Sequence, residues 1–217
     1  MFGPEYLKIN TIFKRDSSNG NVIIPGDWAV PELGYLQGCA WDWTEKIDGM
    51  SIRLHWDGST ATVGGRTDAA QVPARLLAAL GPHLEPGSWR AAFRDADDVT
   101  VYGEGYGAGI QKGAVYRPDQ AVIVFDVRIA GWWLARANVA DVAGKLGLGV
   151  VPTFGSYTVN AAWDGLRAGE LVSHWAGAPI EGLVGRPAVD LFNRNGERIM
   201  AKMKVRDWTQ YQRRAAR

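Results

Sequence analysis

The stretch Trp43-Thr-Glu-Lys-Ile-Asp-Gly-Met-Ser-Ile-Arg-Leu-His-Trp-Asp-Gly58 joins a charged turn to an alternating segment. Residues 51–56 place apolar side chains at every second position, which is the period of a β-strand with one buried face. Asp57-Gly58 is a turn signal, and the short run ATV follows at 61–63. We therefore expect an antiparallel hairpin, with Lys46 just before its first strand.

Short strands separated by glycine and proline turns recur outward from this hairpin. The segment AVIVFDVRI at 121–129 is apolar on both faces and predicts a central strand, and VTVYGE at 99–104 predicts another that ends at Glu104. Helical patterns are few, at 69–81, 137–149 and 161–176. Two sheets with peripheral helices, an α+β fold, are the architecture that these elements favour.

The last predicted strand carries a row of cations. After the turn signal at 193–196, residues 198–206 alternate strictly. An edge strand whose lysines discourage aggregation is the structural alternative. One face would pack and the other would present charge: Ile199, Ala201, Met203 and Val205 form the first, and Arg198, Met200, Lys202, Lys204 and Arg206 form the second.

Length and composition limit the class of protein. With 217 residues and 47% apolar content, the chain can bury the core of one domain, and we expect residues 1–217 to form a single catalytic domain. No run reaches the ~18 apolar residues of a membrane span, and residues 1–10 lack the apolar run of a signal peptide, so we expect a cytoplasmic protein without a membrane partner. One cysteine excludes an internal disulfide, and three scattered histidines argue against a zinc enzyme. A net charge of +1 argues against a uniform nucleic-acid-binding field.

Lys46 is a candidate nucleophile. A lysine amine is protonated at neutral pH, so it needs nearby cations or desolvation before it can attack. Lys202 and Lys204, together with a bound metal, would supply part of this effect and would also neutralise a triphosphate. Gly49, after Asp48, leaves room for close approach of the backbone. The structural alternative is a solvated surface lysine in a turn.

Glu104 lies in a glycine-rich segment with two interpretations. The pattern Gly103-x-Gly105-x-x-Ala108 resembles a dinucleotide fingerprint, which needs a helix directly afterwards. The following residues 110–120 contain Gly113 and Pro118 and predict no such helix. We therefore expect the glycines to shape a turn around Glu104, whose alternative role is that of a surface carboxylate.

Three further side chains are candidates with structural alternatives of their own. Phe125 is either a core residue or a platform on which a base stacks. Glu181, before a predicted strand, is either a ligand or an ordinary ion-paired carboxylate. Arg66 in GGRT is either a turn arginine or a phosphate and ribose contact.

Five segments, in this order, resemble the motifs of the covalent nucleotidyltransferase superfamily of ATP-dependent nucleic acid ligases and mRNA capping enzymes. They are K46-I-D-G49, Y102-G-E-G105, V124-F-D-V127, E181-G-L-V184 and A201-K-M-K204, which look like motifs I, III, IIIa, IV and V. The chain is more narrowly similar to the RNA ligase 2 branch. GIQK at 109–112, Arg66 twenty residues after Lys46 (66 − 46 = 20), and RNG at 194–196 support this narrower likeness, which spans residues 41–206.

The resemblance implies an adenylation domain of antiparallel sheets flanked by short helices, with a nucleotide pocket between the sheets. It implies that Lys46 attacks the α-phosphate of ATP, forms lysyl-AMP and releases pyrophosphate. The adenylate would then pass to an RNA 5′-phosphate, and a 3′-hydroxyl would displace AMP. The implied cofactors are ATP and Mg²⁺ or Mn²⁺.

The resemblance also assigns roles to single residues. Lys46, Lys202 and Lys204 would be catalytic, the last two contacting the α-phosphate. Glu181 would engage the divalent metal, with Glu104 as a second candidate ligand. The nucleotide contacts would be Glu45 and Ile47 flanking the adenine, Asp48 and Gly49 completing motif I, Arg66 and Glu104 at the ribose or the nucleic acid end, Phe125 stacking on the base, and Glu181, Lys202 and Lys204 at the phosphates.

The chain departs from the branch at two points. Asp48 stands where the branch commonly has His, as in DNA ligases and capping enzymes. Thirteen residues follow Lys204 (217 − 204 = 13), where family members often carry a second domain. We therefore expect a monomer without a separate C-terminal domain, gripping nucleic acid through residues 8–16, the Arg-rich tail or an accessory nucleic-acid-binding protein.

Three functions remain open from the sequence. The first is an RNA ligase acting on a nicked duplex or a broken loop, with DNA or hybrid strands as further substrates and a phage-encoded origin compatible with it. The second is a DNA ligase or a GTP-using capping-type enzyme. The third is a non-catalytic nucleotide-binding or nucleic-acid-binding relic. Transfer of label from nucleotide to protein distinguishes them.

Overall fold

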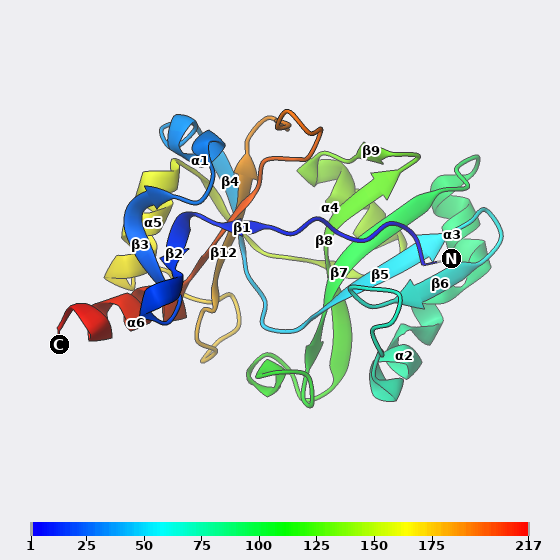
Figure 1. The fold of residues 1–217 in the computed structure, drawn as a ribbon. Helices are drawn as coiled ribbons and strands as arrows, with labels where there is room; N and C mark the ends of the chain where they lie inside the picture. The colour runs from blue at the N-terminus through cyan, green and yellow to red at the C-terminus, as the bar shows by residue number, and fades with distance from the viewer. Residues whose placement is uncertain (1, 217) are drawn as a thin grey trace. The chain divides into compact units, whose positions relative to one another are not determined.

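The computed structural model describes residues 2–216, which divide into two compact units. Unit 1 comprises residues 2–6 and Asp48–Val151, and unit 2 comprises Leu7–Ile47 and residues 152–216. Each unit is built on its own sheet with short helices, as predicted for an α+β protein (Figure 1). No helix among the described residues is long and apolar enough to cross a membrane.

The sheet of unit 1 has six strands. Its order is β10-β8-β7-β5-β6, with β9 pairing with β8, and only β10 runs parallel to its neighbour. The predicted hairpin and the predicted central strand are both present, as β5–β6 and β8. The strands are β5 (Met50–Trp56), β6 (Ala61–Gly64), β7 (Val99–Gly107), β8 (Gln120–Ile129), β9 (Trp132–Trp133) and β10 (Gly149–Val150).

Helices α2 (Ala74–Leu80), α3 (Pro86–Phe93) and α4 (Arg136–Lys145) complete the core of unit 1. The helices predicted at 69–81 and 137–149 are α2 and α4, with shorter bounds. Because Pro73 cannot donate a backbone hydrogen bond within a helix, α2 begins only after it. The core includes Ile52, Leu54, Trp56, Leu76, Leu80, Trp89, Val124 and Val139, all nearly inaccessible to solvent.

The expectation of one buried face on β5 is wrong, because both of its faces are covered. Arg53 and His55 are buried as well as the apolar residues. The N-terminal residues cover the second face: the Arg53 guanidinium donates to the Gly3 carbonyl at 2.6 Å, and the Tyr102 hydroxyl donates to the Pro4 carbonyl at 2.9 Å.

Unit 2 is built on a five-stranded sheet of order β1-β13-β12-β4-β11, with a separate ribbon β2–β3. Trp41, Trp43 and Leu183 from the sheet pack with Trp163 of α5 and with Met203. The strands are β1 (Asn10–Thr11), β2 (Phe13–Asp16), β3 (Val22–Trp28), β4 (Trp41–Glu45), β11 (Thr153–Tyr157), β12 (Gly182–Pro187) and β13 (Ala201–Lys204). The helices are α1 (Pro31–Tyr35), α5 (Val159–Ala168) and α6 (Val205–Ala215).

The strand predicted over 198–206 is shorter than expected. Only Ala201–Lys204 is strand, and it lies between β12 and β1, so it is not an edge strand. Arg198 and Met200 are buried, and Arg206 lies in α6, so only Lys202 and Lys204 form the cationic row. The alternating pattern of residues 198–206 gave no sign of helix α6. This helix packs on the rest of unit 2 through Trp208, whose ring contacts Trp163 of α5 and Tyr211 within α6.

The third predicted helix, at 161–176, also ends early. Helix α5 runs from Val159 to Ala168 and stops at Gly169, whose φ of 74° places it in the left-handed region typical of a helix C-terminus. The Thr158 hydroxyl accepts a hydrogen bond from the Ala161 amide and caps the other end. The residues that follow Gly169 form an irregular segment that leads to Glu181.

A glycine substitution in β7 tests the packing of unit 1. Gly107 has a φ of +118°, and an added Cβ would overlap the Asp119 carbonyl oxygen. We expect Gly107→Ala to lower the free energy of unfolding by at least about 2 kcal/mol, from overpacking and backbone strain. In α4, a Cβ on Gly144 meets nothing within 4 Å, so Gly144→Ala should raise that free energy by about 0.5–1 kcal/mol. Urea denaturation followed by tryptophan fluorescence measures both, and equal effects would contradict this packing.

Tyr102 gives unit 1 a dependence on high pH. Burial raises the pKa of its phenol from 10.0 to about 12. The unfolded chain therefore ionises Tyr102 first, so stability that is complete below pH ~10 is lost as the pH rises toward ~12, by about 2–3 kcal/mol. Tyr102→Phe should make this decline in the free energy of unfolding shallower, whereas the exposed Tyr35→Phe should not. A decline unaffected by Tyr102→Phe would contradict the assignment.

Candidate active site

Three charged side chains of unit 2 lie at the ends of adjacent strands. Lys46 follows the last residue of β4, Glu181 precedes the first residue of β12, and Lys204 ends β13. The antiparallel register pairs Gly182 with Lys204, and the Lys46 amide donates to the Gly182 carbonyl at 3.0 Å. The backbone therefore brings the three side chains to one edge of the sheet.

The Glu181 carboxylate bridges the two lysines. Its Oε2 accepts from Lys46 Nζ at 2.7 Å, and its Oε1 lies 3.2 Å from Lys204 Nζ. The side chains of Lys46, Glu181 and Lys204 are 19%, 15% and 14% exposed. An ion pair this shielded from water interacts more strongly than a surface pair, which contributes little.

Lys202 adds a third positive charge to this region of the sheet. It lies two residues before Lys204 on the same face of β13, where it is half-buried and pairs in register with Val184 and Thr11. Lysine side chains at one edge of a sheet can contact the oxygens of a phosphate chain, so Lys46, Lys202 and Lys204 are candidates for binding a polyanionic ligand such as a nucleotide.

Glu45 was predicted to flank the adenine, but in the structure its side chain contacts other residues of unit 2. Its fully buried carboxylate accepts from the Ser173 hydroxyl at 2.6 Å and from the His174 amide and Nδ1 at 2.9 Å each. These bonds anchor the irregular segment that leads to Glu181. The Glu45 carboxylate is thus engaged within unit 2, and an adenine contact by residue 45 or by the buried Ile47 stays a prediction.

Within unit 1, the start of β5 lies against β7. The Asp48 amide donates to the Tyr116 hydroxyl at 3.2 Å. A Cβ on Gly49 would overlap the Gly105 carbonyl oxygen and press on the Glu104 side chain. Position 49 therefore requires glycine, because the backbone there packs closely against β7. This packing places Asp48 and Gly49 next to Glu104.

Arg66 is exposed on the loop after β6, and a buried arginine holds that loop. The Arg53 side chain is 1% exposed; its Nε donates to the Gly65 carbonyl at 2.8 Å and its Nη2 to Asp68 at 2.7 Å. With its bond to Gly3, the guanidinium clamps the loop that carries Arg66. Sequence reasoning missed this role because alternation alone placed Arg53 on a solvent-facing side.

Phe125 is half-buried in β8, where an N-terminal tyrosine holds it. The Tyr6 ring meets the Phe125 ring edge-on with centroids 5.0 Å apart, and the Tyr6 hydroxyl donates to Asp126 Oδ2 at 2.7 Å. Tyr6 also contacts Tyr102 and Trp133. Sequence reasoning missed Tyr6, for which the N-terminal sequence gives no periodic signal.

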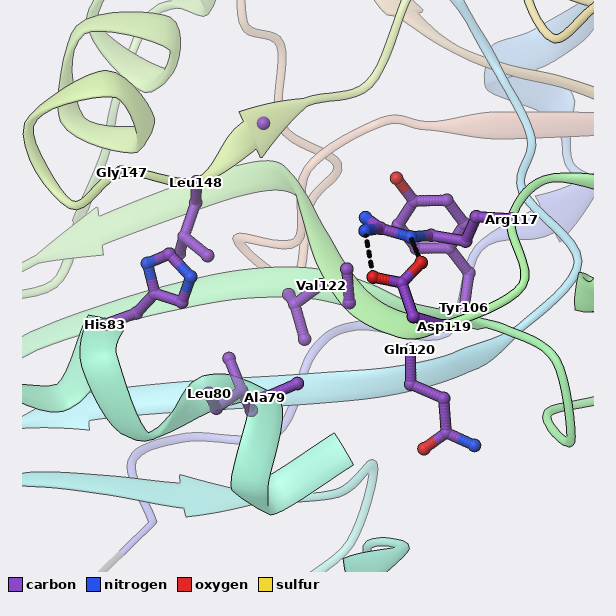
Figure 2. A pocket seen from close by; sticks show the side chains of 12 residues that line it. Ala79, Leu80, His83, Tyr106, Arg117, Asp119, Gln120, Val122, Gly147 and Leu148 are labelled. Carbon is purple, nitrogen blue, oxygen red and sulfur yellow. Dashed lines mark hydrogen bonds and ion pairs between the residues drawn. The ribbon is translucent and has the colours of Figure 1, made fainter. Parts of the chain in front are cut away.

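Unit 1 also has a pocket of about 320 Å³ between α2 and β8 (Figure 2). Leu80, Val122 and Leu148 give it an apolar lining, and Arg117 binds Asp119 through two hydrogen bonds of 2.7 Å. None of the predicted site residues lines this pocket, and its two charged residues, Arg117 and Asp119, form an ion pair with each other. This pocket is therefore distinct from the predicted site residues.

A family model described as RNA ligase matches residues 40–204. The match covers 165 of the 217 residues (204 − 40 + 1 = 165) and contains all the predicted site residues. No curated protein matches the chain.

Solved structures of Naegleria gruberi RNA ligase have a similar fold. A mutant with AMP and Mn is similar with a TM-score of 0.68 and 16% sequence identity, over 97% of this chain and 58% of that chain. A mutant with ATP and Mn gives 0.67 and 16%, with the same coverages. The ligase with PPi gives 0.64 and 17%, over 95% of this chain and 62% of that one. The chain thus spans about three fifths of the length of these relatives, and by its match to the family model it belongs to the RNA ligase family.

Proposed function

We propose that this chain is an ATP-dependent RNA ligase that forms a covalent adenylate on Lys46. The observation that carries the proposal is the Glu181 carboxylate held between Lys46 and Lys204. Membership of the RNA ligase family supports it. So do the similar Naegleria structures, which contain AMP or ATP with Mn.

In the first step, the Lys46 amine in its neutral form attacks the α-phosphorus of ATP. A nitrogen–phosphorus bond forms, the bond between the α-phosphorus and the bridging oxygen breaks, pyrophosphate leaves, and the lysine proton passes to solvent. Negative charge that develops on the phosphoryl oxygens is stabilised by the ammonium groups of Lys202 and Lys204.

The residues present fit a divalent cation held mainly by substrate oxygens. Among residues 2–216, no group of three or more histidine, cysteine, aspartate or glutamate side chains is arranged to hold a metal. Mg²⁺ is commonly bound through one or two carboxylates, phosphate oxygens and water, and Glu181 supplies such a carboxylate. The ion, when bound, would neutralise phosphate charge. Glu104 stays a second predicted ligand.

The remaining assignments are extensions of this proposal. Ile47, Arg66 and Phe125 are the predicted nucleotide contacts, and Arg53 and Tyr6 hold two of them in place. The adenylate would pass to an RNA 5′-phosphate, and a neighbouring 3′-hydroxyl would then displace AMP. We place this activity in the cytoplasm and assign it to residues 1–217 as one catalytic domain.

The covalent step depends on Lys46. We expect Lys46→Ala to abolish transfer of label from ATP labelled on its α-phosphate, because no other amine would lie at the attacking position. The matched control is Lys145→Ala, which removes an exposed lysine of α4 and should label like the unsubstituted protein. Radiolabel retained on denatured Lys46→Ala would contradict the proposal.

The same assay separates the other candidate functions. A capping-type enzyme would take label from GTP, and a binding relic would take label from neither nucleotide. If the protein is labelled by ATP, nicked RNA, DNA and hybrid duplexes can then be compared as substrates. We expect ATP to label the protein and RNA ends to be joined in preference to DNA ends.

Removing the charge of Glu181 tests the bridge between the lysines. Glu181→Gln keeps the size of the side chain but loses the ion pairs to Lys46 and Lys204 and the metal-binding carboxylate. We expect the rate of lysyl-AMP formation to fall by at least about tenfold, as for other groups that orient a reacting site. Single-turnover label transfer measures this rate. An unchanged rate would show that the bridge plays no part in the reaction.

A further inference from the structure

The connection between β12 and β13 exposes apolar side chains that contribute nothing to the core. Val189 is 73% exposed, Phe192 52% and Leu191 38%, and Arg194 lies at the exposed tip. We call residues 188–200 the 188–200 hairpin. Three apolar side chains exposed within the four residues 189–192 make this segment a candidate interaction surface.

The tip of the 188–200 hairpin is held by a network centred on Asn193. The Asn193 amide donates to the Glu197 carbonyl at 2.8 Å. Its side-chain Oδ1 accepts from the Asn195 and Glu197 amides at 3.0 and 2.9 Å, and its Nδ2 donates to the Glu197 carboxylate at 2.9 Å. Four hydrogen bonds across so short a turn favour one conformation.

The base of the hairpin is held as firmly. The Ile199 amide donates to the Leu191 carbonyl at 2.8 Å. The buried Arg198 guanidinium lies 3.0 Å from Asp190, with its side chain only 1% exposed. Exposed side chains on a rigid support lose little conformational freedom when they bind, so this hairpin is preorganised for contact.

The charges of the hairpin leave one cation at its tip. Asp190 is paired with Arg198, and Glu197 is engaged by Asn193. The Arg194 guanidinium has no ion pair within residues 2–216. The exposed residues of the hairpin therefore include an aromatic ring, Phe192, and a cation two residues later, Arg194.

We propose that the 188–200 hairpin is an RNA-contact surface, on which Phe192 stacks against a base and Arg194 binds a backbone phosphate. The inference rests on the proposed function only in taking RNA as the substrate. Aromatic rings stack on bases of any sequence, and arginine binds phosphate, so this pair suits an RNA strand without selecting its sequence.

The sheet connects this surface with the proposed catalytic lysines. Lys202 follows Gly196 by six residues (202 − 196 = 6), and an extended chain of that length reaches at most about 20 Å. This reach corresponds to several nucleotides, because one strand of duplex DNA rises roughly 3.4 Å per nucleotide. The hairpin would thus contact an RNA strand within several nucleotides of Lys202.

Two substitutions and one control test the proposal. We expect Phe192→Ala to weaken the Kd for a 5′-phosphorylated RNA strand about tenfold, through loss of one stacked base. Arg194→Ala should weaken binding and reduce the slope of log Kd against log salt by about one. Tyr35→Ala, which removes an aromatic ring that is 85% exposed on α1, should do neither. Fluorescence anisotropy across a salt series measures all three.

A structural role for the hairpin would give a different pattern. Phe192→Leu keeps an apolar side chain without the ring, so it should bind RNA as weakly as Phe192→Ala if stacking is the cause. Binding restored by leucine would overturn the stacking contact. A Kd unchanged in Phe192→Ala and Arg194→Ala, or a loss of self-association in these variants on gel filtration, would overturn the RNA surface.

The outcome is separable from that of the proposed function. Lysyl-AMP formation by the unsubstituted protein is measured without RNA, and RNA binding is measured without ATP. If ATP labels the protein but Phe192→Ala and Arg194→Ala leave the Kd for RNA unchanged, only the proposed RNA-contact surface is refuted. An unlabelled protein that binds RNA through both residues would refute only the ligase proposal.

Discussion

The ion-pair bridge from Lys46 through Glu181 to Lys204 depends on the register of three strands in unit 2. Gly182 pairs with Lys204, and the Lys46 amide bonds to Gly182, so each side chain reaches the bridge only in this pairing. A slip of one residue in β13 would turn Lys204 toward the core and bring buried Met203 to the polar face. The tryptophan-rich core opposes such a slip, because it would expose apolar surface and bury charge. Core packing and the geometry of the reactive groups are therefore specified together.

Sequence patterns correctly predicted those strands that are determined by neighbouring residues in the chain. The hairpin β5–β6 follows from alternation and a turn signal, and β8 follows from a continuous apolar run. The ordered motifs indicated Lys46, Glu181 and Lys204 as one group, and the structure brings these three together. Local patterns failed where distant residues decide the outcome. The alternation of 198–206 continues past Lys204, yet α6 begins there because Trp208 packs on Trp163.

The buried charged residues Arg53 and Glu45 show the same limit of local sequence patterns. Arg53 looked solvent-facing, but Gly3, Gly65 and Asp68 satisfy its guanidinium from other parts of unit 1. Glu45 sits next to Lys46 in the sequence, yet its carboxylate is held by Ser173 and His174. A buried charge is tolerated only when such partners exist, and no short window of sequence contains them. Arg53 holds the loop that carries Arg66, and Glu45 holds the segment that leads to Glu181. Both residues therefore position predicted site residues from outside the short motifs.

Mass spectrometry of the purified protein after incubation with ATP and magnesium tests the central claim most directly. Peptide mapping of the intact adduct identifies which lysine carries AMP. The account predicts a mass gain of one AMP on the peptide that contains Lys46, and on no other. AMP mapped to Lys202 or Lys204, or a protein that gains no mass, would contradict it.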